Sequence, residues 1–514
     1  MLFFLVLFPF LSFAQKPNWQ NLDLNTDTTF GISTEKAYQQ LLKGKKATTV
    51  IVGVLDGGVD LNHEDLKRII WTNKKEKPGN KVDDDKNGYA DDVHGWNFLG
   101  SAKGSVQHEA LELTRILRND RKKFENVAAV GAADQPAYEQ YKAMKADYDS
   151  QVQEATNAVN GMQGFKNVLD KVVAKIGKPE PTSADFQSYT AANEMEGRLK
   201  SVMVEELKKQ PYAEFYKSQI IKGIEHYADQ LKYNLNLDFD PRPTLVGDKP
   251  DSRERQYGNN DVKGPDASHG THVAGIIAAD RTNTLGIKGV TDNVLIMGVR
   301  AVPDGDERDK DVANSIRYAV DNGAKVLNMS FGKAYSQDKA AVDEAIKYAM
   351  SKDVLIVQAA GNDNKNIDSA KNFPDRRFLT GDTAKAYITV GASGWKDDAD
   401  LKAGFSNYGK TMVDVFAPGE QIYSTVPESK YEAYDGTSMA SPVVAGLAAL
   451  IRSYYPKLTA VQVKEIILKS VVKVNHPVNV KVGEDTKSVP FTDLCLTGGI
   501  VNAYNALQLA ATYK

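Results

Sequence analysis

The chain alternates between two kinds of apolar pattern. Six short runs are almost continuously apolar and rich in β-branched residues, which is typical of strands buried on both faces. Segments with helical spacing lie between several of these runs, for example 311–323 and 338–353. The alternation predicts an α/β fold, a parallel β-sheet with helices on both faces. The six runs are 48–56, 293–302, 325–332, 354–362, 386–393 and 412–419.

Residues 104–250 follow a different pattern. Their segments are rich in Ala, Glu, Lys, Gln and Met, have helical spacing and contain no strand-like run. We therefore expect an α-helical insertion at 104–250 within a main domain formed by 15–103 and 251–514. The charges of the insertion are most simply a solvated face, and docking of a partner there is the alternative. Our hypothesis is a helical cap that limits substrate access or docks a partner.

The N-terminus indicates export. Residues 1–14 form one apolar run that ends in Ser12-Phe13-Ala14, a pattern typical of a signal peptide cleaved after Ala14. The run is short for a transmembrane anchor, which needs about 20 apolar residues, and a buried N-terminal helix is the alternative. The single cysteine, Cys495, permits no intrachain disulfide and favours the bacterial envelope, either periplasmic or extracellular.

Charge and composition exclude some partners. The net charge is −3 at pH 7, and no long block of Lys and Arg occurs, so we expect no nucleic acid partner. The lone cysteine also excludes a cysteine-based zinc site. We expect no organic cofactor.

Three reactive residue types stand at the ends of predicted elements. Asp56 ends the first strand run, His269 opens a helix of small residues, and Ser438 stands at the start of another. A serine becomes a nucleophile when a base removes its proton, and a carboxylate commonly holds that imidazole in one tautomer. A lone serine at a helix start is more often an N-cap, so Ser438 by itself indicates little. The three together indicate nucleophilic catalysis.

Four separated motifs resemble those of the subtilisin-like serine proteases, the subtilases. They are VLDGGV around Asp56, HGTHVAG from His269, AAGN ending at Asn362 and GTSMASP around Ser438. The chain order Asp, His, Ser is also that of subtilisin. The resemblance covers nearly the whole chain except its N-terminal segment and the insertion. It implies a subtilisin-like fold and a serine endopeptidase acting on protein or peptide substrates.

The resemblance also implies a role for each matching residue. Ser438 would attack the peptide carbonyl, His269 would act as base and then acid, and Asp56 would orient His269. The Asn362 side chain, with the Ser438 backbone N–H, would hold the oxyanion. Two stretches would bind an extended substrate, in part through backbone hydrogen bonds. Their residues are Ser330, Phe331, Gly332, Ala359, Ala360 and Gly361.

Some residues near the triad need separate interpretation. His272 follows His269 by one helical turn and matches a structural histidine of the family. Asp60 and Asp65 lie close to Asp56, but neither is followed by glycine, and Asp65 resembles an aspartate that binds calcium in some subtilases. Gly57 departs from the Ser or Thr that many subtilases carry at this position, which alters the hydrogen bonding expected for Asp56.

The stretch 82–98 places oxygen-bearing side chains at alternate positions around Gly88. This is the spacing of an EF-hand-type loop, so we expect structural calcium, with an acidic solvated turn as the alternative. His94 stands where the EF-hand has a bidentate Glu, so Asp92 or a distant group would have to complete the shell. The expected ligands are Asp83, Asp85, Asn87, the Tyr89 carbonyl and Asp91.

The sequence therefore predicts an exported serine endopeptidase that works through an acyl-enzyme. One alternative is a catalytically silent binding or scaffold protein that retains the fold. Intact Asp56, His269, Asn362 and Ser438 argue against it, because a binding role requires none of them. The other is a specialised maturation protease for one partner, which the same residues would serve.

Overall fold

The computed structural model describes residues 16–127, 129–483 and 485–513. These residues form two compact units. The smaller unit is Leu113–Phe239, and the larger combines Lys16–Glu112 with Asp240–Lys514. The predicted signal peptide, residues 1–14, lies outside the described residues.

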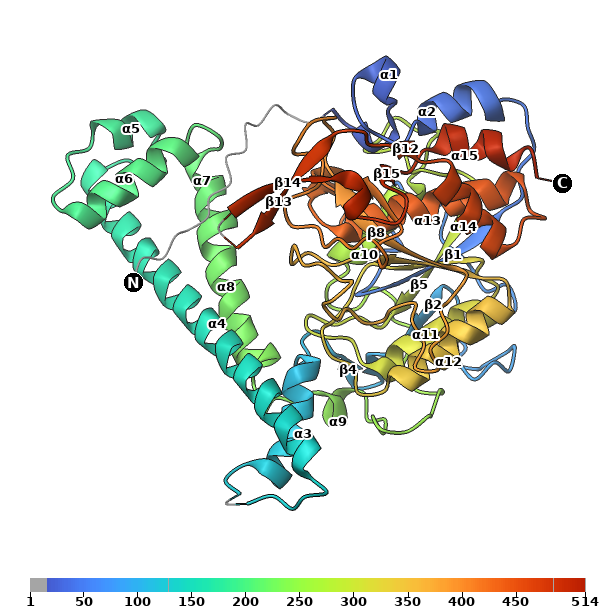
Figure 1. Ribbon diagram of the computed structural model, residues 1–514, viewed down its shortest axis with the longest axis horizontal. Coiled ribbons are helices and arrows are strands. Elements are labelled where there is room, and N and C mark those ends of the chain that lie inside the picture. The colour runs from blue at the N-terminus through green and yellow to red at the C-terminus, as the bar shows by residue number, and fades with distance from the viewer. Residues whose placement is uncertain (1–15, 128, 484, 514) are drawn as a thin grey trace. The chain divides into compact units, whose positions relative to one another are not determined.

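The larger unit is built on a nine-stranded sheet in the order β12-β15-β9-β8-β7-β6-β1-β5-β2 (Figure 1). Neighbouring strands are parallel, except that β12 pairs with β15 in the antiparallel sense. Each of the six apolar runs contains a strand, which confirms the predicted α/β fold. The strands are β1 (Val50–Asp56), β2 (Gly95–Asn97), β5 (Val294–Arg300), β6 (Val326–Met329), β7 (Leu355–Ala359), β8 (Tyr387–Ser393), β9 (Val415–Pro418), β12 (Val472–Lys473) and β15 (Gly499–Ile500).

Helices cover both faces of this sheet. Side chains of α10 (Ser268–Ala278) and α13 (Thr437–Tyr454) form one core with one face, joined by α14 (Ala460–Lys469) and α15 (Ala503–Ala510). Side chains of α11 (Asp309–Asp321) and α12 (Lys339–Ser351) form a second core with the other face.

Strand β1 contributes side chains to both cores. Val52 and Val54 pack into the core of α10 and α13, whereas Leu55 packs into the core of α11 and α12. Successive side chains of a strand point to opposite faces, so a strand buried on both faces must be apolar throughout. At Gly53 a Cβ atom would lie only 2.8 Å from Leu327 Cδ2, so the second core leaves no room for a side chain there.

Shorter elements surround the sheet. None of the three hairpins belongs to the six predicted strand runs, because polar residues interrupt their strands and leave no continuous apolar pattern. The hairpins pair β3 (Gly100–Ser101) with β4 (Gly104–Ser105), β10 (Ile422–Val426) with β11 (Lys430–Tyr434), and β13 (Pro477–Val482) with β14 (Asp485–Pro490). The short helices are α1 (Leu24–Asp27), α2 (Thr34–Ala37) and α9 (Arg242–Leu245).

The smaller unit is helical, with its own apolar core. Helix α4 is 42 residues long and ends at Gly177, whose left-handed backbone (φ 74°) is favoured by glycine. Phe186 and Leu199 are fully or nearly fully buried in the core that this helix shares with its neighbours. Among the described residues, no helix is both long and apolar enough to cross a membrane. The helices are α3 (Glu112–Phe124), α4 (Gln135–Ile176), α5 (Ser183–Ser188), α6 (Glu194–Glu206), α7 (Tyr212–Phe215) and α8 (Lys222–Asp229).

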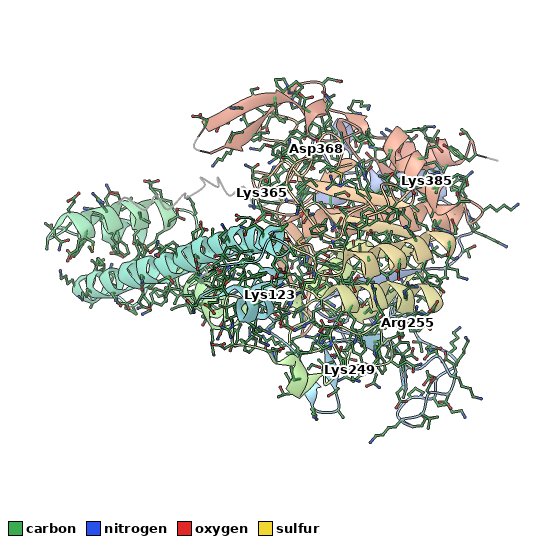
Figure 2. The ribbon with its side chains drawn as sticks, turned by 60° about the horizontal axis from the view of Figure 1, so that its bottom comes forward. Lys123, Lys249, Arg255, Lys365, Asp368 and Lys385 are labelled. Atoms are coloured by element: carbon green, nitrogen blue, oxygen red, sulfur yellow. The ribbon has the colours of Figure 1, made fainter. Side chains whose placement is uncertain are left out.

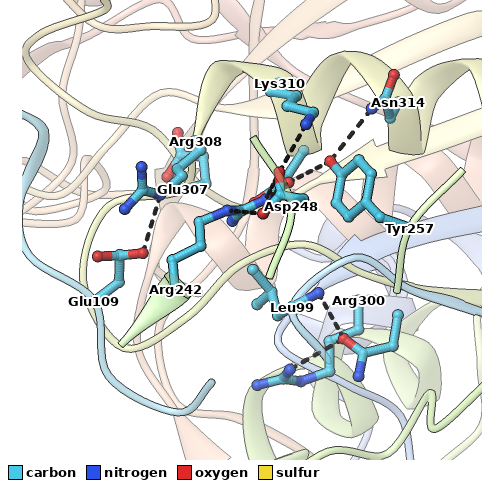
Figure 3. A network of polar contacts seen from close by, with 12 residues as sticks. Leu99, Glu109, Arg242, Asp248, Tyr257, Arg300, Glu307, Arg308, Lys310 and Asn314 are labelled. Atoms are coloured by element: carbon cyan, nitrogen blue, oxygen red, sulfur yellow. Dashed lines mark hydrogen bonds and ion pairs between the residues drawn. The ribbon is translucent and has the colours of Figure 1, made fainter. Parts of the chain in front are cut away.

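The compact helical unit is shorter than the predicted insertion of 104–250. Its flanks belong to the larger unit, because buried charges hold them there. Arg242 is 1% exposed and forms ion pairs of 2.7 Å with both Asp248 and Asp311 (Figure 3 shows its bonds to Asp248). On the other flank, Glu109 pairs with Arg308 at 3.0 Å. Amino-acid composition did not reveal these ion pairs, because a charged residue that is buried in a pair cannot be distinguished by sequence from one that is exposed to solvent.

Candidate active site

Three separate elements of the larger unit present the predicted triad. Asp56 is the last residue of β1 and is 2% exposed. His269 is the second residue of α10, and Ser438 is the second residue of α13. The His269 Nδ1 atom lies 2.8 Å from Asp56 Oδ1, so the structure brings the predicted base and its carboxylate into direct contact.

The Asp56 carboxylate changes the protonation of His269. Burial by itself lowers the pKa of His269, but the negative charge of Asp56 and its hydrogen bond outweigh this, and the net pKa is raised above 6.5. With Nδ1 donating to Asp56, the neutral imidazole keeps Nε2 as its acceptor. This is the tautomer that a general base acting on a serine requires.

The Ser438 hydroxyl donates to the Ser330 backbone carbonyl at 3.1 Å. Ser330 Oγ in turn donates to the Ser438 carbonyl at 2.8 Å, and Asn328 holds Ser330 Oγ at 2.9 Å. Ser441 donates to Asn328 at 2.9 Å, which gives a structural role to the second serine of the GTSMASP motif. Thus buried polar contacts fix the start of α13 against the end of β6. Among the described residues no hydrogen bond joins Ser438 to His269, and without substrate catalytic hydrogen bonds are often long or poorly aligned.

Asn362 lies beside the start of α13. Its side-chain oxygen accepts from the Thr437 backbone N–H at 2.9 Å and from Thr437 Oγ1 at 2.8 Å. Thr437 Oγ1 also accepts from the Gly361 N–H at 3.0 Å. These contacts orient the exposed Asn362 amide, whose nitrogen has no acceptor among the described residues. A donor held in this way beside a helix N-terminus is suited to bind an oxyanion.

The predicted substrate-binding stretches follow adjacent strands. Ser330–Gly332 continues from β6, and Ala359 ends β7, with Ala360 and Gly361 directly after it. Because β6 and β7 are parallel neighbours, both stretches lie at the same edge of the sheet. Phe331 is 9% exposed, and Ala359 and Ala360 are also buried.

Asn372 joins these two stretches and was missed by sequence reasoning. Its side-chain nitrogen donates to the Ala360 carbonyl at 3.1 Å. A Cβ atom on Gly332 would lie 2.7 Å from Asn372 Oδ1, so any larger residue there would displace the Asn372 side chain. No motif marks Asn372, because it reaches the site through a long loop whose position only the fold defines.

Gly57 contributes one backbone hydrogen bond to Asp56. The Gly57 N–H donates to Asp56 Oδ1 at 2.7 Å, and Asp56 Oδ2 is buried without a hydrogen-bond partner among the described residues. The carboxylate is therefore held by His269 and one backbone N–H.

The neighbouring ionisable residues have other roles. The His272 ring stacks on Tyr434 at 4.3 Å, and burial lowers the pKa of His272 to about 3, so it stays neutral at physiological pH. Asp60 forms an ion pair with Lys263 at 3.2 Å. Asp65 is buried and accepts from the Asn283 side chain at 2.7 Å. Among the described residues, only Asp56 is within ion-pair distance of His269.

The acidic loop gathers a different set of carboxylates from the one expected. Glu76, Asp83 and Asp85 each place a carboxylate oxygen within 4.8 Å of the others. Asp91 lies outside this group, because its carboxylate accepts from the backbone N–H groups of Gly79 at 2.8 Å and Lys81 at 2.6 Å. Glu76 was not predicted, since it precedes the motif in sequence.

The remaining loop residues support this cluster. Asp92 is fully buried, and burial raises its pKa to about 6, while Tyr318, Asn87 and Asn73 donate to it. Asn87 also closes the turn, because its side-chain oxygen accepts from the Tyr89 N–H at 2.8 Å. The Tyr89 ring is buried against Trp96 and Tyr318. These internal hydrogen bonds hold the loop beside the three carboxylates.

Comparison with known families matches this arrangement. The model of the subtilase family aligns with residues 47–488, which is most of the chain. The chain belongs to the subtilase family. The aligned range contains Asp56, His269, Asn362 and Ser438.

Individual relatives align over shorter segments. A thermophilic serine proteinase from Bacillus sp. (strain AK1) is 43% identical over 36% of this chain and 43% of its own length. Thermitase from Thermoactinomyces vulgaris is 41% identical over 36% of this chain and 61% of its own length. Among solved structures, a protease from Pseudoalteromonas arctica is 28% identical over 49% of this chain and 78% of its own, with a TM-score of 0.40. The chain thus matches less than two thirds of these first two relatives.

Proposed function

We propose that this subtilase is a serine endopeptidase that hydrolyses protein or peptide substrates through an acyl-enzyme. The observation that carries the proposal is the 2.8 Å contact between His269 Nδ1 and the buried Asp56 carboxylate, in a family whose members use such a pair to activate serine. A binding protein would have no use for this contact.

Each residue has one task in the proposed reaction. His269 removes the Ser438 proton as Oγ attacks the peptide carbonyl, and then delivers that proton to the leaving amine. Asp56 stabilises the imidazolium formed between these steps. Asn362 and the backbone N–H of Ser438 bind the oxyanion. Water then attacks the acyl-enzyme, and His269 again serves as base.

A fluorophosphonate probe tests the proposal directly, because it labels only a serine that is activated. We expect the folded protein to be labelled and the Ser438→Ala variant to lose labelling completely. Ser453→Ala is a matched control, because Ser453 lies in the same helix and its hydroxyl donates to the Leu450 carbonyl of that helix, away from the triad. Folded wild-type protein that fails to label would favour the scaffold alternative.

A second measurement separates a general endopeptidase from a maturation enzyme. Cleavage of a random peptide library at many sequences would support broad specificity, which backbone pairing along Ser330–Gly332 favours. Cleavage at one defined sequence would instead support the specialised maturation enzyme.

We also propose that the protein is exported. The support is the apolar segment 1–14 and the absence of any intrachain disulfide partner for Cys495. The N-terminus of the protein recovered from the periplasm or the medium should then begin at Gln15. Full-length protein retained in the cytoplasm would contradict export.

Calcium is the ligand that we propose for the Glu76 cluster. All three side chains offer carboxylate oxygens, which fit a hard cation, and Asn87 and Asp92 lie in the same loop. Binding would hold the loop 76–92 together and would supply no chemistry to the triad. At about 100-fold excess over its dissociation constant, calcium should stabilise the fold by about 2.7 kcal/mol.

The calcium proposal is tested by thermal unfolding with calcium and with a chelator. The shift in Tm should vanish in Glu76→Gln. It should persist in Asp84→Asn, because Asp84 lies in the same loop but outside the cluster. An equal shift in both variants would contradict this site.

A further inference from the structure

The larger unit contains a cavity of about 280 Å³ that has no role in the proposed reaction. One wall is the loop 252–255, and the others are α11 and α12, which contribute the small residues Ala313 and Ala341. Its charged lining consists of Arg253, Arg255, Lys310, Arg317, Asp338 and Glu344. Figure 2 labels Arg255 beside these two helices. None of the proposed catalytic residues lines this cavity.

The wall formed by the loop is held in place by buried polar contacts. Lys310 Nζ bonds to Asp248 at 2.7 Å, to the Lys249 carbonyl at 2.8 Å and to Ser252 Oγ at 3.2 Å. Asn314 donates to the Glu254 carbonyl at 2.9 Å and to Tyr257 Oη at 3.2 Å. Figure 3 shows Lys310, Asn314 and Tyr257 in this network. The loop that carries Arg253 and Arg255 is therefore fixed to α11, and the cavity is preformed.

Four cations and two carboxylates line the cavity, and Lys310 is already paired with Asp248 outside the lining. Arg253 is paired with Asp338 at 3.0 Å. Arg317 only approaches Glu344, at 3.9 Å, and Glu344 is largely exposed. Arg255 has no carboxylate within ion-pair distance among the described residues. Among the described residues, Arg255 is thus left without a close counter-ion, and Arg317 has only the loose contact with Glu344.

These two groups also repel each other. Burial and the positive charge of Arg255 hold the pKa of Arg317 below its usual value, and the weak contact with Glu344 does not compensate. Arg317 is further confined by the Tyr348 ring, which lies 5.3 Å from its guanidinium carbon. An anion bound between Arg255 and Arg317 would remove this repulsion and occupy the hydrogen-bond donors of both.

We propose that this cavity is a binding site for a compact anion with two negative charges. Two planar guanidinium groups match the oxygens of a phosphate or of a small dicarboxylate. The size is near the lower end for small-ligand pockets. Asp338 and Glu344 in the lining disfavour a nucleic acid or another polyanion, which would meet both of them.

Isothermal titration of the full chain tests the site. Inorganic phosphate and succinate are the two probes, each titrated at constant ionic strength because salt screens exposed charges. We expect saturable binding at one site, with a dissociation constant of about 1 mM or lower for at least one probe. Binding of phosphate alone would assign phosphorylated ligands, and binding of succinate alone would assign dicarboxylates. No saturable binding of either probe would overturn the proposal.

Variants then place the anion in the cavity. Arg255→Gln and Arg317→Gln should each weaken binding at least ten-fold, and Arg255→Lys should retain part of the affinity. Arg255 is exposed, so its substitution should not disturb folding. Arg68→Gln is the control, because Arg68 is an exposed arginine of the same unit that does not line the cavity. Binding that is unchanged in both cavity variants, or equally weakened by the control, would contradict the site.

Discussion

The two long helices α13 and α4 represent two ways of stabilising a helix. Helix α13 in the larger unit is buried along almost its whole length and crosses the central sheet in the core. Helix α4 in the smaller unit has 42 residues, of which only Tyr141, Met144, Ala155, Leu169 and Val172 are buried. On its exposed faces it has local pairs such as Lys145 with Asp149 and Lys166 with Asp170.

This difference bears on the location that we propose for the active site. The start of α13 is fixed by non-local packing, so Ser438, Thr437 and the neighbouring Asn362 keep their mutual geometry. A helix that depends mainly on local contacts opens more easily and holds its side chains less precisely. We therefore expect catalysis to depend on the larger unit, and the helical unit to act on substrate choice rather than on bond cleavage.

The largest expected effect is on the triad. His269→Ala should lower kcat by roughly 10⁶-fold, as loss of the triad histidine does in subtilisin. The matched variant in the helical unit is His226→Ala, which alters an exposed side chain of α8 and should leave kcat unchanged. Steady-state kinetics on a short peptide measures both. A large loss of kcat in His226→Ala would show that the helical unit takes part in the chemistry.

Core truncation should separate the two units energetically. Phe186→Ala in the helical unit and Phe416→Ala in the larger unit each remove a fully buried ring, at a cost of about 3–5 kcal/mol. Phe186→Ala should increase hydrogen exchange in 135–234 and leave cleavage of a short peptide intact. Phe416→Ala should reduce both stability and cleavage. An equal loss of activity in Phe186→Ala and Phe416→Ala would mean that the two units unfold cooperatively.

The pH dependence should originate in the larger unit alone. His269 must be neutral to act as base, and its pKa is raised above 6.5 by Asp56 despite the opposing effect of burial. As the pH falls below that pKa, kcat/KM should drop about ten-fold per pH unit. At higher pH the base is deprotonated and activity is retained. The profile of His226→Ala should coincide with that of the wild type, and a displaced acid limb in that variant would contradict this origin.

The sequence predicted the features that depend on local pattern. The strand runs around Asp56 and Asn362 and the helix starts at His269 and Ser438 are readable because apolar periodicity and glycine-rich motifs mark them. Glu76 and Asn372 were not predicted, because each lies in a loop whose position depends on the whole fold. The buried ion pairs at the flanks of the insertion were missed for a related reason. Arg242 is a buried ion-pair partner, but the sequence alone does not distinguish a buried arginine from an exposed one.

The smallest expected effect concerns the surface of α4. Lys145 and Asp149 lie 2.5 Å apart, but both side chains are substantially exposed. Such a pair at i and i+4 contributes about 0.3–0.5 kcal/mol, because water screens the charges and two flexible side chains lose entropy. Lys145→Gln should therefore lower the stability of the helical unit by no more than this amount, and the difference should shrink in high salt.

The matched variant in the larger unit is Arg242→Gln, which leaves Asp248 and Asp311 buried with less positive charge beside them. Its expected cost is about 3–5 kcal/mol and should respond little to salt, because breaking a buried ion pair strands an uncompensated charge. Denaturant unfolding at low and high salt measures both variants. Comparable losses, or equal sensitivity to salt, would show that the two units do not differ in how their charges stabilise them.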